Sequence, residues 1–342
     1  MKVLGIESSC DECAAAVVED GARILSNVVA TQIPFHAAYE GVVPEIASRM
    51  HTEWIYGVVK EALDQAGLTS GGIDGVAVTA RPGMLGSLLV GLSFAKAFAW
   101  SLNLPFIGVD HMLAHLYASR LDGAAGDEPP PEYPFLGLLA SGGHSIICRV
   151  DDFDGVTVLG TTIDDAVGEA FDKVAKYYGF GYPGGAAIDK LAQTGDASAF
   201  AFPMPNLYKG EHRYDLSYSG LKTAAINQLE QFRSKKTANL EDIAASFQKT
   251  AIEILLRSLF RAAEDTKLTT IVGGGGVAAN SYLRSRLAEQ PELRSIFPRL
   301  DLCGDNGAMI AGLGYQYLIR GDRSPLNTTA SARVRTFKRR YP

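Results

Sequence analysis

The stretch KVLGIESSCDECAAAVVE, residues 2–19, decides the predicted fold. Its two apolar segments, residues 2–6 and 14–19, consist mainly of Val, Leu, Ile and Ala and predict two buried strands. The polar residues 7–11 lie between them and predict a turn. The chain therefore opens with a hairpin. Because similar runs alternate with helical stretches over the whole length, we predict an α/β protein with largely buried strands.

The same pattern of strand, turn and strand returns later in the sequence. Residues 135–140 predict a strand, the turn SGGHS follows, and residues 146–150 predict the returning strand. Between the two patterns lies DGAAGDEPPPEYP, residues 122–134, whose Pro and Gly residues disfavour both helix and sheet. We therefore predict a duplicated α/β unit with a boundary in this segment.

Apolar periodicity and bounding turn residues predict the other elements. The apolar residues 84–100 include Lys96, fall short of a membrane span and predict a buried helix. The remaining predictions are strands at 75–79, 106–109 and 270–272, helices at 164–178, ending at Gly179, and at 240–263, a turn at 273–276 into a helix near Asn280, and a last helix opened by Asp305, Asn306 and Gly307 that runs to about residue 319.

Charge and cysteine content narrow the class of protein. The 342 residues include 32 Lys and Arg against 38 Asp and Glu, a net charge of −6, so any nucleic-acid contact needs a local basic patch. Four scattered cysteines do not form a disulfide framework, which leads us to expect a cytoplasmic protein. Since the longest apolar stretch, residues 84–100, falls short of a membrane span, we expect no membrane partner. The basic tail, residues 331–342, is either a polyanion contact or a solvated tail, and it contains Arg333, Arg335, Lys338, Arg339 and Arg340.

The segment VDHMLAH has a metal-chelating pattern. His111 and His115 are four residues apart on a predicted helix and share one face, either as metal ligands or as satisfied polar groups. In zinc peptidases a Glu follows the first His as general base, but Met112 stands there, so a peptidase mechanism lacks its base. Asp305 begins a predicted helix and is either its N-cap or a third ligand. Two imidazoles and one carboxylate with open positions suit iron(II) or zinc.

Other polar positions allow a structural and a functional interpretation. The turn Ser141-Gly142-Gly143 can offer backbone N–H groups to a phosphate, or it can be a plain hairpin turn. Asp11 and Glu12, at the tip of the first hairpin, either face a ligand or are solvated turn carboxylates. Asp172 and Asp189 either hold ribose or a charged substrate end, or are helix-face charges. The sequence contains no G-x-x-x-x-G-K-[ST] pattern, which excludes a Walker-type nucleoside triphosphatase.

Eight segments stand in a specific order between residue 3 and about residue 318: GIESSCDE, VVPEIASRMH, HMLAH, SGGHS, GEAFDKVAKYYGFGYPGG, SYSGLKT, GGGVAAN and CGDNGAMIA. In these segments the chain resembles the TsaD family, the tRNA N6-adenosine threonylcarbamoyltransferases, once described as O-sialoglycoprotein endopeptidases, and it is similar to their bacterial branch. The resemblance implies an actin-like α/β fold, shared with sugar kinases and heat-shock chaperones, with two related halves around a central cleft. On this fold residues 1–121 form the first half, completed by the C-terminal helix 305–320; residues 122–134 connect it to the second half, 135–304.

The resemblance also implies an activity and a site. Members transfer the threonylcarbamoyl group of threonylcarbamoyl-adenylate to N6 of the adenosine 3′ of the anticodon, in tRNAs that read ANN codons, and release AMP. One iron(II) per subunit, with zinc as the alternative, would be held by His111, His115 and Asp305. We nominate Asp11 as the carboxylate that accepts the N6 proton. Implied substrate contacts are Leu139, Ala140, Ser141, Gly142, Gly143, Asp172, Gly185, Asp189 and Asn280.

Partners and alternatives follow from the same resemblance. Bacterial members work with a paralogue called TsaB and a small ATPase called TsaE, besides tRNA and the adenylate. The alternatives are a metal-dependent glycoprotein endopeptidase, a non-catalytic nucleotide-binding scaffold and, from the fold alone, a kinase. Retention of all three implied metal ligands argues against a scaffold. The sequence departs from the family pattern at Cys13, Arg81, Leu113, Ala114, Ala186 and Gly304.

Overall fold

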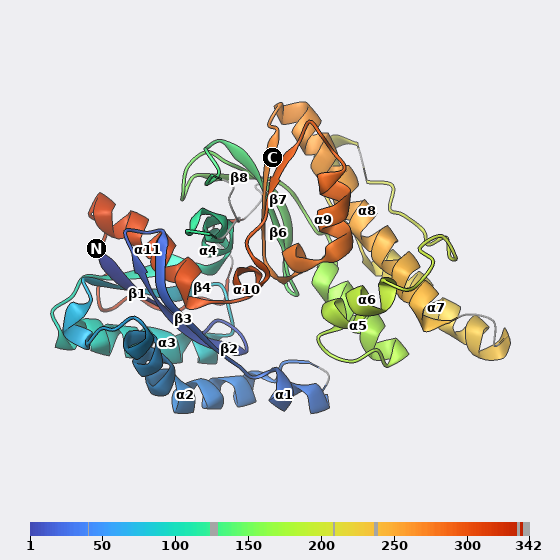
Figure 1. Cartoon of the computed structure of the whole chain (residues 1–342). Helices are drawn as coiled ribbons and strands as arrows, with labels where there is room; N and C mark the ends of the chain where they lie inside the picture. Colours follow the sequence, from blue (N-terminus) through green and yellow to red (C-terminus); the bar gives the residue numbers. More distant parts are fainter. Residues whose placement is uncertain (40, 124–128, 208, 236–238, 334–335, 338–342) are drawn as a thin grey trace. The chain divides into compact units, whose positions relative to one another are not determined.

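The computed structural model describes residues 1–39, 41–123, 129–207, 209–235, 239–333 and 336–337. Two compact units divide these residues. Unit 1 comprises Met1–Pro131 and the described residues from 297 onward, and unit 2 comprises Glu132–Ile296. The chain thus enters unit 1, builds unit 2 and returns to unit 1 (Figure 1).

Unit 1 is built on a five-stranded mixed sheet in the order β3-β2-β1-β4-β5. The central strand β1 (Lys2–Glu7) pairs antiparallel with β2 (Glu12–Glu19) and parallel with β4 (Gly75–Arg81). The strands β3 (Arg23–Thr31) and β5 (Phe106–Asp110) form the edges. The predicted opening hairpin is therefore confirmed.

Unit 2 repeats this sheet. Its order is β10-β9-β6-β7-β8, and β6 (Phe135–Ala140) again pairs antiparallel with the next strand, β7 (Ser145–Val150), and parallel with β9 (Thr270–Gly274). The edges are β8 (Val156–Thr161) and β10 (Arg294–Ile296). Since order and direction match strand for strand, the predicted duplication is confirmed.

Helices cover both faces of the unit 1 sheet. Because side chains alternate along β1, Leu4 and Ile6 pack in a core with α2 and α3, whereas Gly5 faces α11 on the opposite side (Figure 1). A Cβ atom at Gly5 would lie 2.8 Å from Ala311 Cβ and closer still to Gly307 O, so this glycine permits the close approach. The helices of unit 1 are α1 (Ile33–His36), α2 (Pro44–Gln65), α3 (Leu85–Ser101), α4 (His111–Tyr117), α10 (Leu300–Cys303) and α11 (Gly307–Arg320).

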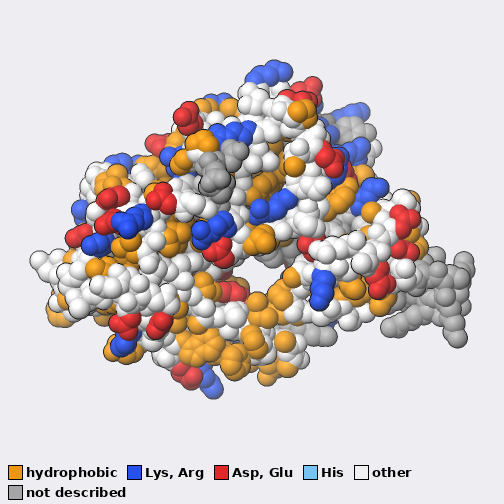
Figure 2. Space-filling model, in the orientation of Figure 1, with side chains coloured by type: hydrophobic (Ala, Val, Ile, Leu, Met, Phe, Trp, Pro, Cys, Tyr) orange, Lys and Arg blue, Asp and Glu red, His pale blue; other side chains and the backbone are white. Residues whose placement is uncertain are grey.

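The prediction that residues 84–100 form a buried helix is confirmed for the helix and wrong for part of its burial. The helix α3 exists, but it buries one face only, and Leu85, Leu89 and Trp100 are exposed. Apolar side chains on α1 and α2, namely Phe35 and Tyr56, are also exposed. Figure 2 shows hydrophobic side chains gathered over α1 and the neighbouring part of α2. A predominantly apolar helix can therefore carry an apolar face that the described part of the chain leaves uncovered.

Three of the unit 2 helices were predicted and differ from prediction mainly at their ends, whereas α6 (Gly184–Ala192) and α7 (Ser219–Lys235) were not predicted. The helix α5 begins at Val167 rather than at residue 164, because the Asp164 carboxylate instead accepts hydrogen bonds from Tyr218 N, at 2.8 Å, and from nearby serines. It ends at Gly179, whose φ of 74° closes the helix as predicted. The helices of unit 2 are α5 (Val167–Tyr178), α6 (Gly184–Ala192), α7 (Ser219–Lys235), α8 (Leu240–Thr266) and α9 (Ser281–Ala288).

Two predicted segments lie partly outside the described residues. These are residues 124–128 of the Pro/Gly-rich connection and, in the basic tail, Arg335, Lys338, Arg339 and Arg340. Arg333 is described and exposed. Among the described residues, no helix combines the length and apolar character needed to cross a bilayer.

Candidate functional site

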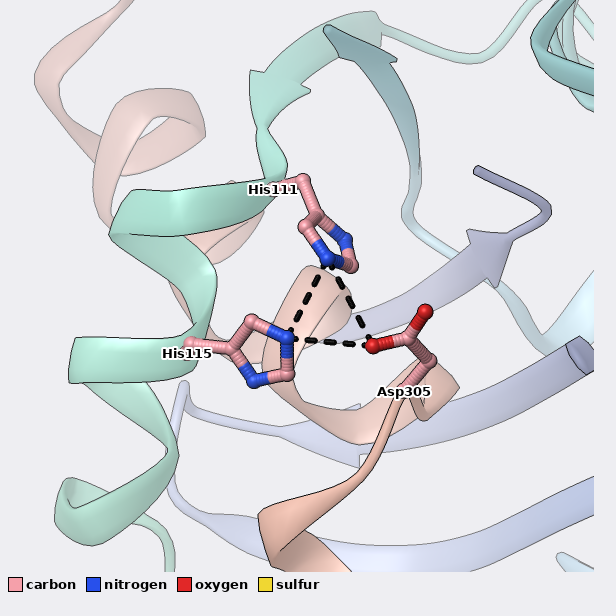
Figure 3. Close-up of side chains that lie close together, drawn as sticks. All are labelled: His111, His115 and Asp305. Carbon is pink, nitrogen blue, oxygen red and sulfur yellow. Dashed lines mark hydrogen bonds and ion pairs between the residues drawn. The ribbon is translucent and has the colours of Figure 1, made fainter. Parts of the chain in front are cut away.

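The two histidines of VDHMLAH lie on α4, directly after β5. The Asp110 carboxylate caps this helix, since its Oδ1 accepts hydrogen bonds from Met112 N at 3.0 Å and Leu113 N at 3.4 Å. The helical spacing places both imidazoles on one face, with ring centroids 4.5 Å apart. Their Nε2 atoms are 3.1 Å apart (Figure 3).

Asp305 joins this pair from the loop that precedes α11. Asn306, not Asp305, caps α11, because the Asn306 Oδ1 accepts a hydrogen bond from Met309 N at 3.0 Å. The N-cap interpretation of Asp305 is therefore wrong. Its Oδ1 instead lies 3.1 Å from His115 Nε2 and 3.5 Å from His111 Nε2 (Figure 3).

The donor set fits a divalent transition metal. The ligand atoms of His111, His115 and Asp305 all lie within 4.8 Å of one another. Bonds of about 2.1 Å to a common ion would space neighbouring ligand atoms by about 3 Å, close to the separations found here. Among the described residues only three ligands converge, so the cluster leaves coordination positions for a substrate.

Glu7 is a partner of this cluster that the sequence interpretation missed. It ends β1, is fully buried, and its Oε2 accepts a hydrogen bond from His111 Nδ1 at 2.9 Å. Burial alone would raise the pKa of Glu7, but the charge of His111 outweighs that effect and lowers the pKa. In the sequence Glu7 directly follows the apolar residues 3–6, a local pattern that does not by itself indicate a partner of His111.

Proton binding at His111 predicts a pH dependence of metal affinity. Burial alone would lower the pKa of His111, but the carboxylates of Asp305 and Glu7 outweigh it and raise the pKa to about 9 in the metal-free protein. Below that pH a metal must displace a proton, so we expect the affinity to rise about tenfold per pH unit from roughly pH 7 to 9 and then level off. Titration with Co²⁺ against a competing chelator measures this, and a flat profile contradicts it.

Asp11 and Glu12 lie beside the cluster and are not solvated turn carboxylates. Asp11 is only 8% exposed, and its carbonyl accepts a hydrogen bond from Gln32 N at 3.0 Å. Burial, Asp305 and Asp11 together raise the pKa of Glu12 to about 9. Unit 1 therefore gathers several carboxylates around one point, an arrangement that a bound cation would stabilise.

The second group of nominated residues lies in unit 2, at the β6–β7 turn. The turn is closed by a hydrogen bond from Ser141 N to His144 O at 2.8 Å. Gly142 and Gly143 are exposed, and a Cβ atom at either would meet no atom within 4 Å. Packing within the protein thus leaves space beside both glycines, as a ligand-facing turn requires. The side chains of Leu139 and Ala140 are buried in the sheet, so only their backbone could contact a substrate.

The remaining nominated residues hold the starts of two helices. Asp172 Oδ1 accepts a hydrogen bond from Gly184 N at 2.8 Å, next to Gly185. Asn280 caps α9 and donates from Nδ2 to Asp189 Oδ1 at 3.3 Å. Asp189 also accepts hydrogen bonds from Gln248, Ser281 N and Ser281 Oγ. The structure therefore brings Asp189 and Asn280 together and places Asp172 beside Gly185.

Topology and site together define a class: a duplicated α/β protein with an open two-His, one-Asp cluster in its first unit. Solved structures with this fold include component A of (R)-2-hydroxyglutaryl-CoA dehydratase from Acidaminococcus fermentans, with 13% identity, a TM-score of 0.54 and coverage of 93% of this chain and 99% of that one. Full-length HypF in a phosphate- and nucleotide-bound form matches with 15% identity, a TM-score of 0.59 and coverage of 93% and 55%. The predicted actin-like fold class is confirmed.

The family is defined by sequence. The model of TsaD, tRNA N6-adenosine threonylcarbamoyltransferase, matches residues 23–312, and the chain belongs to this family. Curated relatives named tRNA N6-adenosine threonylcarbamoyltransferase include those of Treponema denticola, 66% identical over 99% of both chains, and Treponema pallidum, 58% identical over 99% of this chain and 95% of the relative. The relative from Borreliella burgdorferi is 51% identical over 100% and 96%. The predicted family membership is confirmed.

Proposed function

We propose that this chain transfers the threonylcarbamoyl group from threonylcarbamoyl-adenylate to N6 of the adenosine 3′ of the anticodon, in tRNAs that read ANN codons, with release of AMP. The observation that carries the proposal is the 66% identity over 99% of both chains to a relative named for this transfer. The chain is accordingly an acyltransferase that acts on tRNA.

The chemistry is the attack of an amine on an activated carbonyl. The N6 atom forms a C–N bond to the carbonyl carbon, the bond from that carbon to the phosphate oxygen breaks, and N6 loses a proton as AMP departs. Backbone N–H groups of the turn at Ser141, Gly142 and Gly143 would bind the phosphate. Leu139 and Ala140 would contribute backbone contacts, and Asp172, Gly185, Asp189 and Asn280 would position the adenylate.

We assign one iron(II) per chain to His111, His115 and Asp305, with zinc as the alternative. The donor set supports this, because two imidazoles and one carboxylate with open positions suit either ion. When bound, the ion would supply Lewis-acid stabilisation of the charge that develops on carbonyl and phosphate oxygens.

Asp11 is the proposed acceptor of the N6 proton. It is buried beside Glu12 and is not one of the three clustered ligands. We expect Asp11→Asn to lower the rate of transfer about 100-fold, because a neutral amide cannot accept the proton. Single-turnover transfer to tRNA at saturating Co²⁺ measures the rate, and a Co²⁺ titration serves as the control that the variant still binds metal. Transfer at the native rate would remove Asp11 from the mechanism.

No observation favours the alternatives. At the position where a zinc peptidase carries its general base, Met112 is only 2% exposed and packs into the core. A scaffold or a kinase would not require three converging metal ligands.

Partner proteins and a cytoplasmic location complete the proposal. We expect a TsaB-like paralogue and a TsaE-like ATPase to assist. With a net charge of −6, the chain by itself should bind the negatively charged tRNA only weakly. The exposed apolar side chains of α1 and α2 offer a surface for one such partner (Figure 2). All four cysteines are free, as suits the cytoplasm.

One reconstitution tests the function. The chain, its partner proteins, synthetic threonylcarbamoyl-adenylate and unmodified tRNA are mixed, and the tRNA is digested and searched for the modified nucleoside. We expect the modified nucleoside only when the chain is present. Its absence from a mixture in which the chain is folded and metal-loaded would refute the proposal, and peptide release from a glycoprotein would favour the endopeptidase.

A further inference from the structure

Glu7 is a buried carboxylate to which the proposed reaction assigns no role. Its side chain is fully buried at the end of β1, whereas Glu residues are rarely buried unless they are paired. Its Oε2 lies 2.9 Å from His111 Nδ1. The ring of His111 therefore has one nitrogen on Glu7 and the other, Nε2, in the cluster with His115 and Asp305.

The Glu7 carboxylate is fixed from both oxygens. Thr79 Oγ1 donates to Oε2 at 2.5 Å, and the backbone N–H of Ser9 donates to Oε1 at 2.5 Å. Ser9 Oγ also lies 3.3 Å from His111 Nδ1, a longer contact than that of Glu7. Since β4 and the turn after β1 supply the donors, the carboxylate cannot turn away from the ring without losing hydrogen bonds in a buried site.

The hydrogen bond selects a tautomer of His111. A carboxylate accepts only, so the proton must lie on Nδ1, which leaves the Nε2 lone pair for a metal. The second histidine lacks such support, because no described residue is a hydrogen-bond partner for the buried Nδ1 of His115. The orientation of the His111 ring, which is fixed by Glu7, therefore sets the direction from which the two histidines can bind an ion.

We propose that Glu7 is the positioning residue of the metal site, holding the His111 ring so that Nε2 faces the ion. This inference rests on the proposed metal site and adds a residue that contacts one of its ligands, His111, rather than the ion. Such carboxylate partners orient the ring and strengthen it as a donor, and their loss commonly weakens metal binding about 10- to 100-fold.

The test measures metal binding without the reaction. The full-length chain and its Glu7→Ala, Glu7→Gln and Thr79→Val variants are freed of metal and titrated with Co²⁺ against a competing chelator. We expect Glu7→Ala to weaken binding about 10- to 100-fold and to change the visible spectrum of bound Co²⁺. Glu7→Gln keeps an acceptor oxygen but loses the charge, so its Co²⁺ affinity should lie between that of Glu7→Ala and that of the unaltered chain. Thr79→Val should lower the Co²⁺ affinity less, in the same direction.

Ser8→Ala is the matched control. Ser8 is the adjacent buried polar residue, but its Oγ donates to Ser87 O at 3.0 Å, away from the cluster, so its loss should leave Co²⁺ affinity unchanged. Native affinity and spectrum in both Glu7→Gln and Thr79→Val would overturn the inference, even if Glu7→Ala failed to fold. A chain that binds Co²⁺ normally but does not modify tRNA would refute the proposed function and leave the role of Glu7 standing.

Discussion

Asp305→Asn should reduce threonylcarbamoyl transfer about 100- to 1,000-fold. The substitution keeps the shape of the side chain but removes the anionic member of the cluster, whose Oδ1 lies 3.1 Å from His115 Nε2 and 3.5 Å from His111 Nε2. A neutral amide is a weak ligand, and a metal contributes several kcal/mol of charge stabilisation, where about 1.4 kcal/mol corresponds to a factor of ten. Transfer rates and Co²⁺ affinity, measured on the same preparations, should fall together.

Asp301→Asn is the control for Asp305→Asn. Asp301 belongs to the preceding short helix, α10, and its exposed carboxylate pairs with Arg299 at 2.9 Å. Exposed pairs of this kind contribute about 1 kcal/mol or less, so transfer and metal affinity should stay native. Equal activity of the Asp305→Asn variant and the unaltered chain would contradict a metal-dependent reaction at this cluster.

Gly5→Val should cause the largest loss of stability, about 3 kcal/mol or more. A side chain at this position would collide with the backbone of α11 at Gly307 O and Ala311 N, which cannot move aside as a side chain can. Displacement of α11 would also shift Asp305, which directly precedes it, so Co²⁺ affinity should fall although no ligand is changed. Denaturant unfolding and the Co²⁺ titration measure the two effects.

Gly57→Ala tests the addition of a side chain to a glycine that has open space around it. Gly57 is an exposed residue inside α2, and a Cβ atom there would meet no atom within 4 Å. We expect this variant to be more stable than the native chain by up to about 1 kcal/mol, because Gly is a poor residue for a helix interior. If Gly5→Val were as stable as the native chain, the close contact between β1 and α11 would be wrong.

Local patterns in the sequence were sufficient to predict much of the fold. The hairpins at residues 2–19 and 135–150 were predictable because apolar runs and turn residues report directly on buried strands. The edge strands β3 and β8 were not predicted, since Arg23–Thr31 and Val156–Thr161 are only partly buried and lack a continuous apolar run. The uncovered face of α3 was not predictable either, because composition does not reveal which apolar side chains find a partner.

The residues of the site likewise include some that local sequence patterns predict and others that they do not. His111 and His115 were predictable because helical spacing alone brings them together. The role of Asp305 stayed ambiguous until Asn306 was seen to cap α11, since either residue type serves as an N-cap. Glu7 could not be nominated, because its partnership with His111 depends on the pairing of β1 with β4 and β4 with β5, which no local pattern specifies.

The cluster joins His115 to a carboxylate 190 positions further along the chain, with the whole of unit 2 between them. During synthesis on the ribosome, the histidines emerge long before Asp305 and α11. A nascent chain therefore exposes two ligands of an incomplete site while unit 2 is being made, and firm binding of the proposed metal would have to wait until translation is nearly finished. Any product of premature termination within unit 2 would lack the acid that completes the cluster, and it would be unable to withhold the ion from competing chelators in the cell.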